Sequence, residues 1–79
     1  MSITLKNNQE HKDFKGGVYI YKTSGALDIQ QQLDKEGFAT VTDGVIAGAE
    51  SGIIELALDS DVKVANGGAN TLILSHVRP

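Results

Sequence analysis

The sequence predicts an all-β fold, a small antiparallel β-sandwich or barrel of about seven short strands with an extended N-terminal arm. Runs of alternating or β-branched apolar residues recur about every ten residues, a spacing typical of sandwiches and barrels. Clusters of Gly, Asn, Asp and Ser, which favour turns, separate these runs. With 79 residues, the chain is long enough for one small domain.

The N-terminal region is expected to be a strand followed by an arm, so that residues 1–17 precede a single β-domain over residues 18–79. The first few residues alternate between apolar and polar side chains, as a half-buried strand does. Residues 7–15 are polar apart from Phe14. We therefore expect an extended arm in which this ring is the one apolar anchor.

Residues 18–21 combine β-branched and aromatic side chains, which predicts a strand. Val18 and Ile20 share one face of this strand, and Tyr19 and Tyr21 share the other. Both faces need cover. A second sheet can cover one face and a neighbouring subunit the other.

Residues 26–36 fit two kinds of structure. As a strand, Leu27 and Ile29 share a face, and the turn at 34–37 leads into a clear strand at 38–42, which together form a hairpin. As a helix, the same segment would give an α+β domain with one helix at about 26–36. The hairpin is the preferred interpretation because the returning strand is rich in β-formers.

The second half of the sequence predicts further strands at 53–58, 62–64 and 71–77, of which the last is the most apolar. Asp43 and Gly44 form a turn signal, and residues 66–70 form another that is rich in residues able to adopt positive φ.

Composition argues against several classes of function. The absence of Cys excludes disulfides and thiolate metal sites. A net charge of −3 gives little support to nucleic-acid binding. No apolar run approaches the roughly 20 residues of a membrane span, and no signal-peptide pattern is visible. We expect a soluble protein made in a cytoplasm, with neither nucleic acid nor membrane as partner.

Charge is distributed unevenly along the chain. Residues 1–22 carry four lysines and two acidic residues, a net charge of +2, whereas residues 23–79 carry three basic and eight acidic residues, a net charge of −5. The basic segment could fold onto its own acidic body or bind that of a neighbouring copy. Chance is the alternative, since each exposed ion pair contributes at most ~1 kcal/mol.

No arrangement of residues predicts catalysis, a metal site or a cofactor. His11 and His76 are the two histidines, and their separation matches no metal-ligand spacing. We expect His11 in solvent and His76 on the exposed face of its strand. Asp59 and Asp61 lack the glycine and the further carboxylates of a calcium loop. The sequence therefore predicts no enzyme activity, no cofactor and no small-molecule substrate.

Aromatic side chains are the remaining candidates for function, as anchors in a protein interface. Phe38 is expected in the core, and one tyrosine could join it there. Phe14 and the tyrosine face are expected to contact a partner, together with the lysines of the arm. The predicted interface consists of Lys12, Phe14, Lys15, Tyr19 and Tyr21.

The segment 26–44 resembles a pattern found in small virion proteins of tailed bacteriophages. A strand ends in a Leu-Asp-x-x-Gly turn, returns through an aromatic-led strand ending Val-Thr-Asp-Gly, and continues through a glycine loop to an Ile-Glu-Leu strand. The resemblance extends over about residues 25–77. Many such strands carry Trp in the returning strand, where this chain has Phe38.

This resemblance implies a β-sandwich or barrel that decorates, cements or joins parts of a phage particle, usually as a symmetric oligomer. The implied partners are the major capsid protein or another virion protein and copies of the chain itself, and the implied location is the virion. The alternative is a monomeric protein-binding module, such as a phage-encoded regulator of a host protein. Light scattering on the purified chain distinguishes the two.

Overall fold

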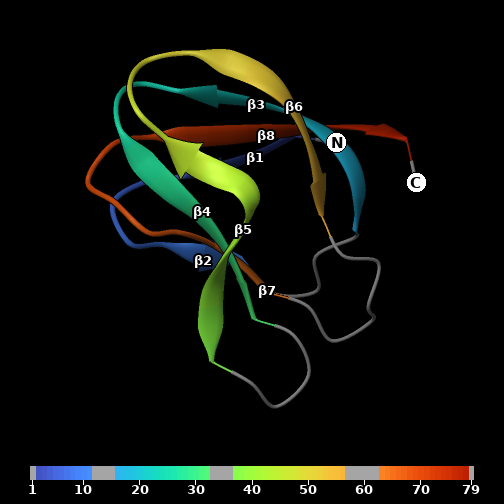
Figure 1. Cartoon of the computed structure of the whole chain (residues 1–79), viewed down its shortest axis with the longest axis horizontal. Helices are drawn as coiled ribbons and strands as arrows, with labels where there is room; N and C mark the ends of the chain where they lie inside the picture. Colours follow the sequence, from blue (N-terminus) through green and yellow to red (C-terminus); the bar gives the residue numbers. More distant parts are fainter. Residues whose placement is uncertain (1, 12–15, 33–36, 57–62, 79) are drawn as a thin grey trace.

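Two antiparallel sheets pack against each other in the computed structural model of the chain (Figure 1), which describes residues 2–11, 16–32, 37–56 and 63–78. Each sheet has four strands, and these residues contain no helix. The prediction of an all-β sandwich is confirmed. In chain order the strands are β1 (Ser2–Leu5), β2 (Glu10–His11), β3 (Gly17–Thr23), β4 (Leu27–Gln32), β5 (Phe38–Ile46), β6 (Ser51–Leu56), β7 (Lys63–Asn66) and β8 (Leu72–Arg78).

The strand order is β1-β8-β3-β6 in sheet A and β2-β7-β4-β5 in sheet B. Every consecutive pair of strands except β4 and β5 lies in different sheets. β4 pairs with β5 as the hairpin interpretation predicts, so a helix at 26–36 is wrong as far as residue 32. Residues 33–36, which include most of the predicted turn, lie outside the described residues. No helix among the described residues is long and apolar enough to cross a bilayer.

Apolar side chains that alternate along the strands meet between the two sheets. Tyr19, Leu72 and Leu74 from sheet A and Ile29 and Val64 from sheet B are each 0% exposed. Removing this apolar surface from water is the main force that holds the sheets together. The same core cluster includes Ile3, Leu5, Leu27, Ile46, Ile54 and Leu56.

The N-terminal residues contribute a strand to each sheet. β1 pairs with β8 over four positions, from Ser2 opposite Ser75 to Leu5 opposite Leu72. β2 pairs with β7 over two positions. Residues 12–15, the rest of the arm expected from the sequence, lie outside the described residues.

Hydrogen bonds link the connections that cross between the sheets. The backbone N–H of Asn8 donates to the carbonyl of Gly68 at 3.2 Å, which joins the β1–β2 connection to the β7–β8 connection. The hydroxyl of Thr23, at the end of β3, donates to the carbonyl of Gly48 at 2.8 Å and accepts from the N–H of Glu50 at 3.2 Å. These bonds hold the crossing connections at fixed positions relative to the two sheets.

β5 contains a bulge where the sequence predicts a turn. Residues 41–44 lie opposite the single β4 residue Ile29, because the register between the two strands shifts there. Asp43 lies in the left-handed region, with φ of 61°. Asp43 and Gly44 therefore bend a strand and do not end it, as extra residues in one strand of an antiparallel pair do.

Replacing Gly44 with alanine is expected to lower the free energy of unfolding by about 1–3 kcal/mol, the usual effect of overpacking. A Cβ at this position would lie 2.6 Å from Cγ2 of Val41 and 2.8 Å from the backbone oxygen of Ile29. Urea denaturation followed by circular dichroism measures the change. The matched control is Gly48→Ala, where no atom lies within 4 Å of the new Cβ, and we expect a change within about 0.5 kcal/mol. Equal effects of the two substitutions would contradict the packing described at the bulge.

Candidate interaction surfaces

Tyr19, predicted as an interface residue, lies in the core. Its side chain is 0% exposed, and its ring centroid is 4.9 Å from that of His76 on β8. Burial raises the pKa of the Tyr19 hydroxyl. Tyr19 therefore fills space between the sheets and offers no surface to a partner, which corrects its assignment to the interface.

His76 also differs from its expected position. Its Nε2 atom is buried and its side chain is half-buried, facing Tyr19. Alternation along β8 places His76 on the same face as Leu72 and Leu74. The prediction that His76 lies on the exposed face of its strand is therefore wrong. Phe38, expected in the core, is half-buried at the start of β5 and belongs to no part of the core cluster.

Tyr21 is half-buried and packs against the core from its edge. Its hydroxyl donates a hydrogen bond to Oε1 of Glu50 at 3.1 Å. Burial is the main cause that raises the pKa of Tyr21, and the hydrogen bond to Glu50 and the negative charges of Glu50 and Asp43 raise it further. The tyrosine thus ties β3 to the β5–β6 connection. The other three predicted interface residues, Lys12, Phe14 and Lys15, lie outside the described residues.

We expect the fold to lose stability as the pH rises above about 10, the ordinary pKa of tyrosine. Because the folded-state pKa of Tyr21 is raised, its contribution to stability is complete below the unfolded-state pKa and is lost as the pH rises through the folded-state pKa. Glu50→Gln is expected to move the ionisation of Tyr21 to lower pH. Tyrosinate absorbance measures this ionisation, and Tyr21→Phe identifies the signal, since the chain has two tyrosines. An unchanged titration in Glu50→Gln would show that the negative charge of Glu50 has no such effect, since the glutamine oxygen can still accept the hydrogen bond.

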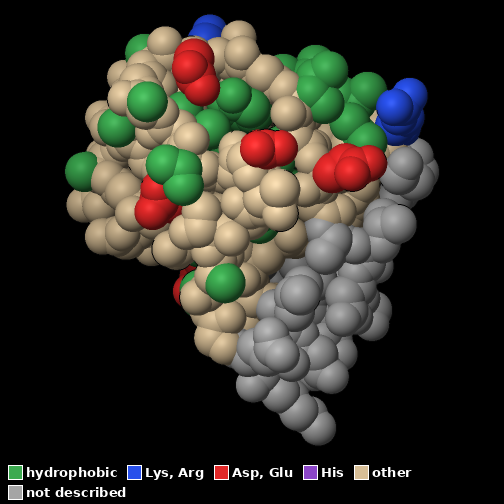
Figure 2. All heavy atoms as spheres, in the orientation of Figure 1, with side chains coloured by type: hydrophobic (Ala, Val, Ile, Leu, Met, Phe, Trp, Pro, Cys, Tyr) green, Lys and Arg blue, Asp and Glu red, His purple; other side chains and the backbone are tan. Residues whose placement is uncertain are grey.

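An apolar patch lies on the outer face of sheet A, on the side of β3 opposite the tyrosines. Ile20 is 45% exposed, Ile53 is 72% exposed and Val77 is 52% exposed; we call these three residues the outer patch. Ile20 pairs directly with Ile53 across β3 and β6. In Figure 2 hydrophobic side chains gather over the region where β6 lies in Figure 1. The sequence analysis missed this surface because it predicted that Tyr19 and Tyr21 form the face of β3 that contacts a partner.

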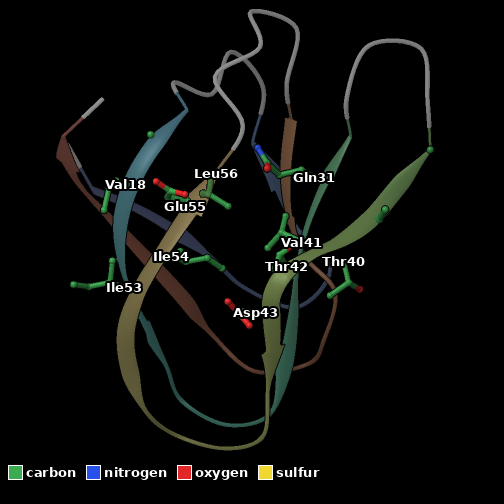
Figure 3. Close-up of a pocket in the computed structure, with 13 residues that line it drawn as sticks. Val18, Gln31, Thr40, Val41, Thr42, Asp43, Ile53, Ile54, Glu55 and Leu56 are labelled. Carbon is green, nitrogen blue, oxygen red and sulfur yellow. The ribbon is translucent and has the colours of Figure 1, made fainter.

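A groove of about 900 Å³ lies between β5 and β6, each of which is an end strand of its sheet in the described part of the chain. Figure 3 shows Val41 of β5 and Ile54 and Leu56 of β6 pointing into it from opposite sides. Asp43 and Glu55 also line the groove, and none of its described lining residues is basic. The groove leaves the outer edge of β6 uncovered by β5 along these residues.

The described residues contain no group of three or more His, Asp or Glu side chains that could hold a metal ion. The candidate interaction surfaces are the outer patch and the edge of β6 beside the groove. Comparisons of the chain with protein-family models, with curated proteins and with solved structures gave no match.

Proposed function

We propose that this chain is a structural protein of a phage particle, a capsid decoration, cement or accessory protein that acts through protein–protein contacts. The resemblance of residues 26–44 to small virion proteins supports the particle as its location. The outer patch is the observation that supports a contact surface. A solvated face of an antiparallel sheet normally carries polar side chains, whereas Ile20, Ile53 and Val77 are apolar and exposed.

The position of the outer patch suits assembly. Ile20 lies on β3, between β6 and β8 in sheet A, and Ile53 lies beside it on the end strand β6, so the patch extends from the middle of the sheet face to one edge. Apolar contacts at the centre of an interface contribute most of the binding energy when a polar rim excludes water from them. Lys22 and Glu55 are exposed on the same strands and can form part of such a rim.

Binding to capsids tests this function. Empty capsids of the virus that encodes the chain, assembled without it, are mixed with the purified protein and sedimented. We expect the protein to sediment with the capsids at a fixed, saturating ratio. The combined substitutions Ile20→Lys and Val77→Lys should weaken binding by about tenfold or more, which corresponds to a loss of ~1.4 kcal/mol.

Val45→Lys is the matched control, because Val45 is an apolar strand residue that is 72% exposed but lies in sheet B. This variant should sediment with capsids as the unmodified chain does. A protein that stays in the supernatant at all concentrations would overturn the proposed function. Capture of a single host protein by a chain that remains monomeric would establish the regulatory alternative in its place.

A further inference from the structure

Among the end strands that the structure describes, β6 has the longest edge without a shift in register. β6 pairs with β3 over six positions, from Ser51 opposite Lys22 to Leu56 opposite Gly17, without a shift in register. The other end strand of sheet A, β1, pairs over only four positions, and the end strands of sheet B are β2, which pairs over two, and β5, where the bulge at 41–44 interrupts the edge. A regular edge presents N–H and C=O groups that another strand can pair with, whereas a bulge protects an edge from such pairing.

The side chains of β6 also leave its edge open to another strand. Ile53 is the most exposed apolar residue on the strand, at 72%. It is one of the residues that line the groove, and its side chain is directed away from Val41 in Figure 3. Gly52 next to it has no side chain. Glu55 is the one charged residue on β6, and no lysine or proline, the residues that commonly protect an edge, interrupts the strand.

We propose that two copies of the chain pair antiparallel through β6, about a two-fold axis centred on Ile53, so that sheet A continues from one copy into the other. This dimer rests on the proposed function, because it is the self-association that a structural assembly protein needs. A two-fold axis makes the interface isologous, so each residue of β6 meets a residue of the same strand in the second copy.

The side chains select this register among the possible ones. Centred on Ile53, the pairing places Ile53 opposite Ile53 of the second copy, Gly52 opposite Ile54, and Ser51 opposite Glu55. The exposed isoleucines then cover each other, and the serine hydroxyl can donate to the carboxylate. Each copy adds Ile20 beside this contact, since Ile20 pairs with Ile53 within the chain.

The neighbouring registers are less favourable for physical reasons. Centring the axis on Ile54 places Ile53 opposite the Glu55 carboxylate of the second copy, twice in each dimer. Centring it on Glu55 places two carboxylates directly opposite, which is destabilising. Centring it on Gly52 removes the contact between the two Ile53 side chains and shifts the pairing toward the β5–β6 connection.

Sedimentation equilibrium of the full chain tests the dimer. We expect twice the monomer mass for the unmodified chain and for Val45→Lys, which changes an equally exposed valine in sheet B. Ile53→Lys places two like charges at the axis and should give the monomer mass at the same concentrations. A monomeric unmodified chain, or an Ile53→Lys variant that still dimerises, would overturn the proposal.

Cysteine cross-linking tests the register, because the unmodified chain contains no cysteine. Directly opposed residues have Cβ atoms about 4.5–5.5 Å apart, close to the separation in a disulfide. Ile53→Cys should therefore cross-link with itself under mild oxidation. Glu55→Cys alone should not, but a mixture of Glu55→Cys and Ser51→Cys should form the mixed dimer. Cross-linking of Glu55→Cys with itself, without cross-linking of Ile53→Cys, would reject this register.

The capsid and cross-linking experiments fail independently of each other. A chain that binds capsids but forms no β6 cross-link retains the proposed function and loses this dimer. A chain that cross-links through Ile53→Cys but never sediments with capsids retains the dimer and loses the proposed function.

Discussion

Tyr19→Ala is expected to lower the free energy of unfolding by about 3–5 kcal/mol, the usual effect of truncating a buried aromatic side chain. Among the described residues, Tyr19 has the largest fully buried side chain, and it lies between the two sheets. Its removal leaves a cavity that the surrounding strands can fill only in part. Small domains are stable by only about 5 kcal/mol or slightly more, so the variant should have little or no cooperative unfolding transition in urea.

The neighbouring residue provides the control for this substitution. Ile20 is on the same strand, is 45% exposed and faces solvent on the outer side of sheet A. Ile20→Ala should lower the stability of the monomer by less than about 1 kcal/mol. If Tyr19 were instead an interface anchor, Tyr19→Ala would leave the stability of the monomer unchanged and reduce only its association. Circular dichroism and sedimentation, measured on both variants, separate these outcomes.

The orientation of β3 shows what the sequence could and could not predict. Alternation in residues 18–21 correctly separates Val18 and Ile20 from Tyr19 and Tyr21, because side chains on a strand point to opposite faces. Alternation alone does not say which face is inward when both are apolar. That choice depends on Leu72 and Leu74 of β8, which pack on the tyrosine side and are distant in sequence.

The hairpin and the bulge show the same limit at a second place. Leu27 and Ile29 are buried, as the strand interpretation of 26–32 predicts. This segment pairs with the next strand in the sequence, β5, which is rich in residues that favour strands. Asp43 and Gly44 are typical of a turn, and Asp43 does adopt the positive φ that many turns require. Whether such a residue ends a strand or bends it depends on pairing with β4 on either side of the bulge, which local sequence does not contain.

Interaction surfaces are harder to predict than the core. The exposure of Ile53 follows from the consecutive isoleucines at 53 and 54, because one of two neighbours on a strand must face outward. The sequence therefore contains a signal for part of the outer patch, in its two consecutive isoleucines. Lys12, Phe14 and Lys15 lie outside the described residues, so their place in an interface stays a prediction.

Asn66→Ala is expected to lower the free energy of unfolding by about 2–4 kcal/mol. Asn66 is 1% exposed at the end of β7. Its Nδ2 donates to the carbonyl of Leu5 at 3.0 Å and to the carbonyl of Asn70, and its Oδ1 accepts from the N–H of Gly68 at 3.0 Å. Alanine would leave these groups without their partner, and each buried polar group that loses its hydrogen bond costs about 1–3 kcal/mol.

Asn70→Ala is the control for Asn66→Ala, because it removes a nearby asparagine side chain that is less buried. Asn70 is half-buried, and its Nδ2 donates one exposed hydrogen bond to the carbonyl of Ala26 at 2.8 Å, so we expect a loss of only about 0.5–1.5 kcal/mol. The difference follows from position, because Asn66 joins β1, β7 and the β7–β8 connection through a side-chain amide that is itself buried. Urea midpoints measured side by side decide the matter: if the two variants lose equal stability, the buried amide does not hold this end of the sandwich together.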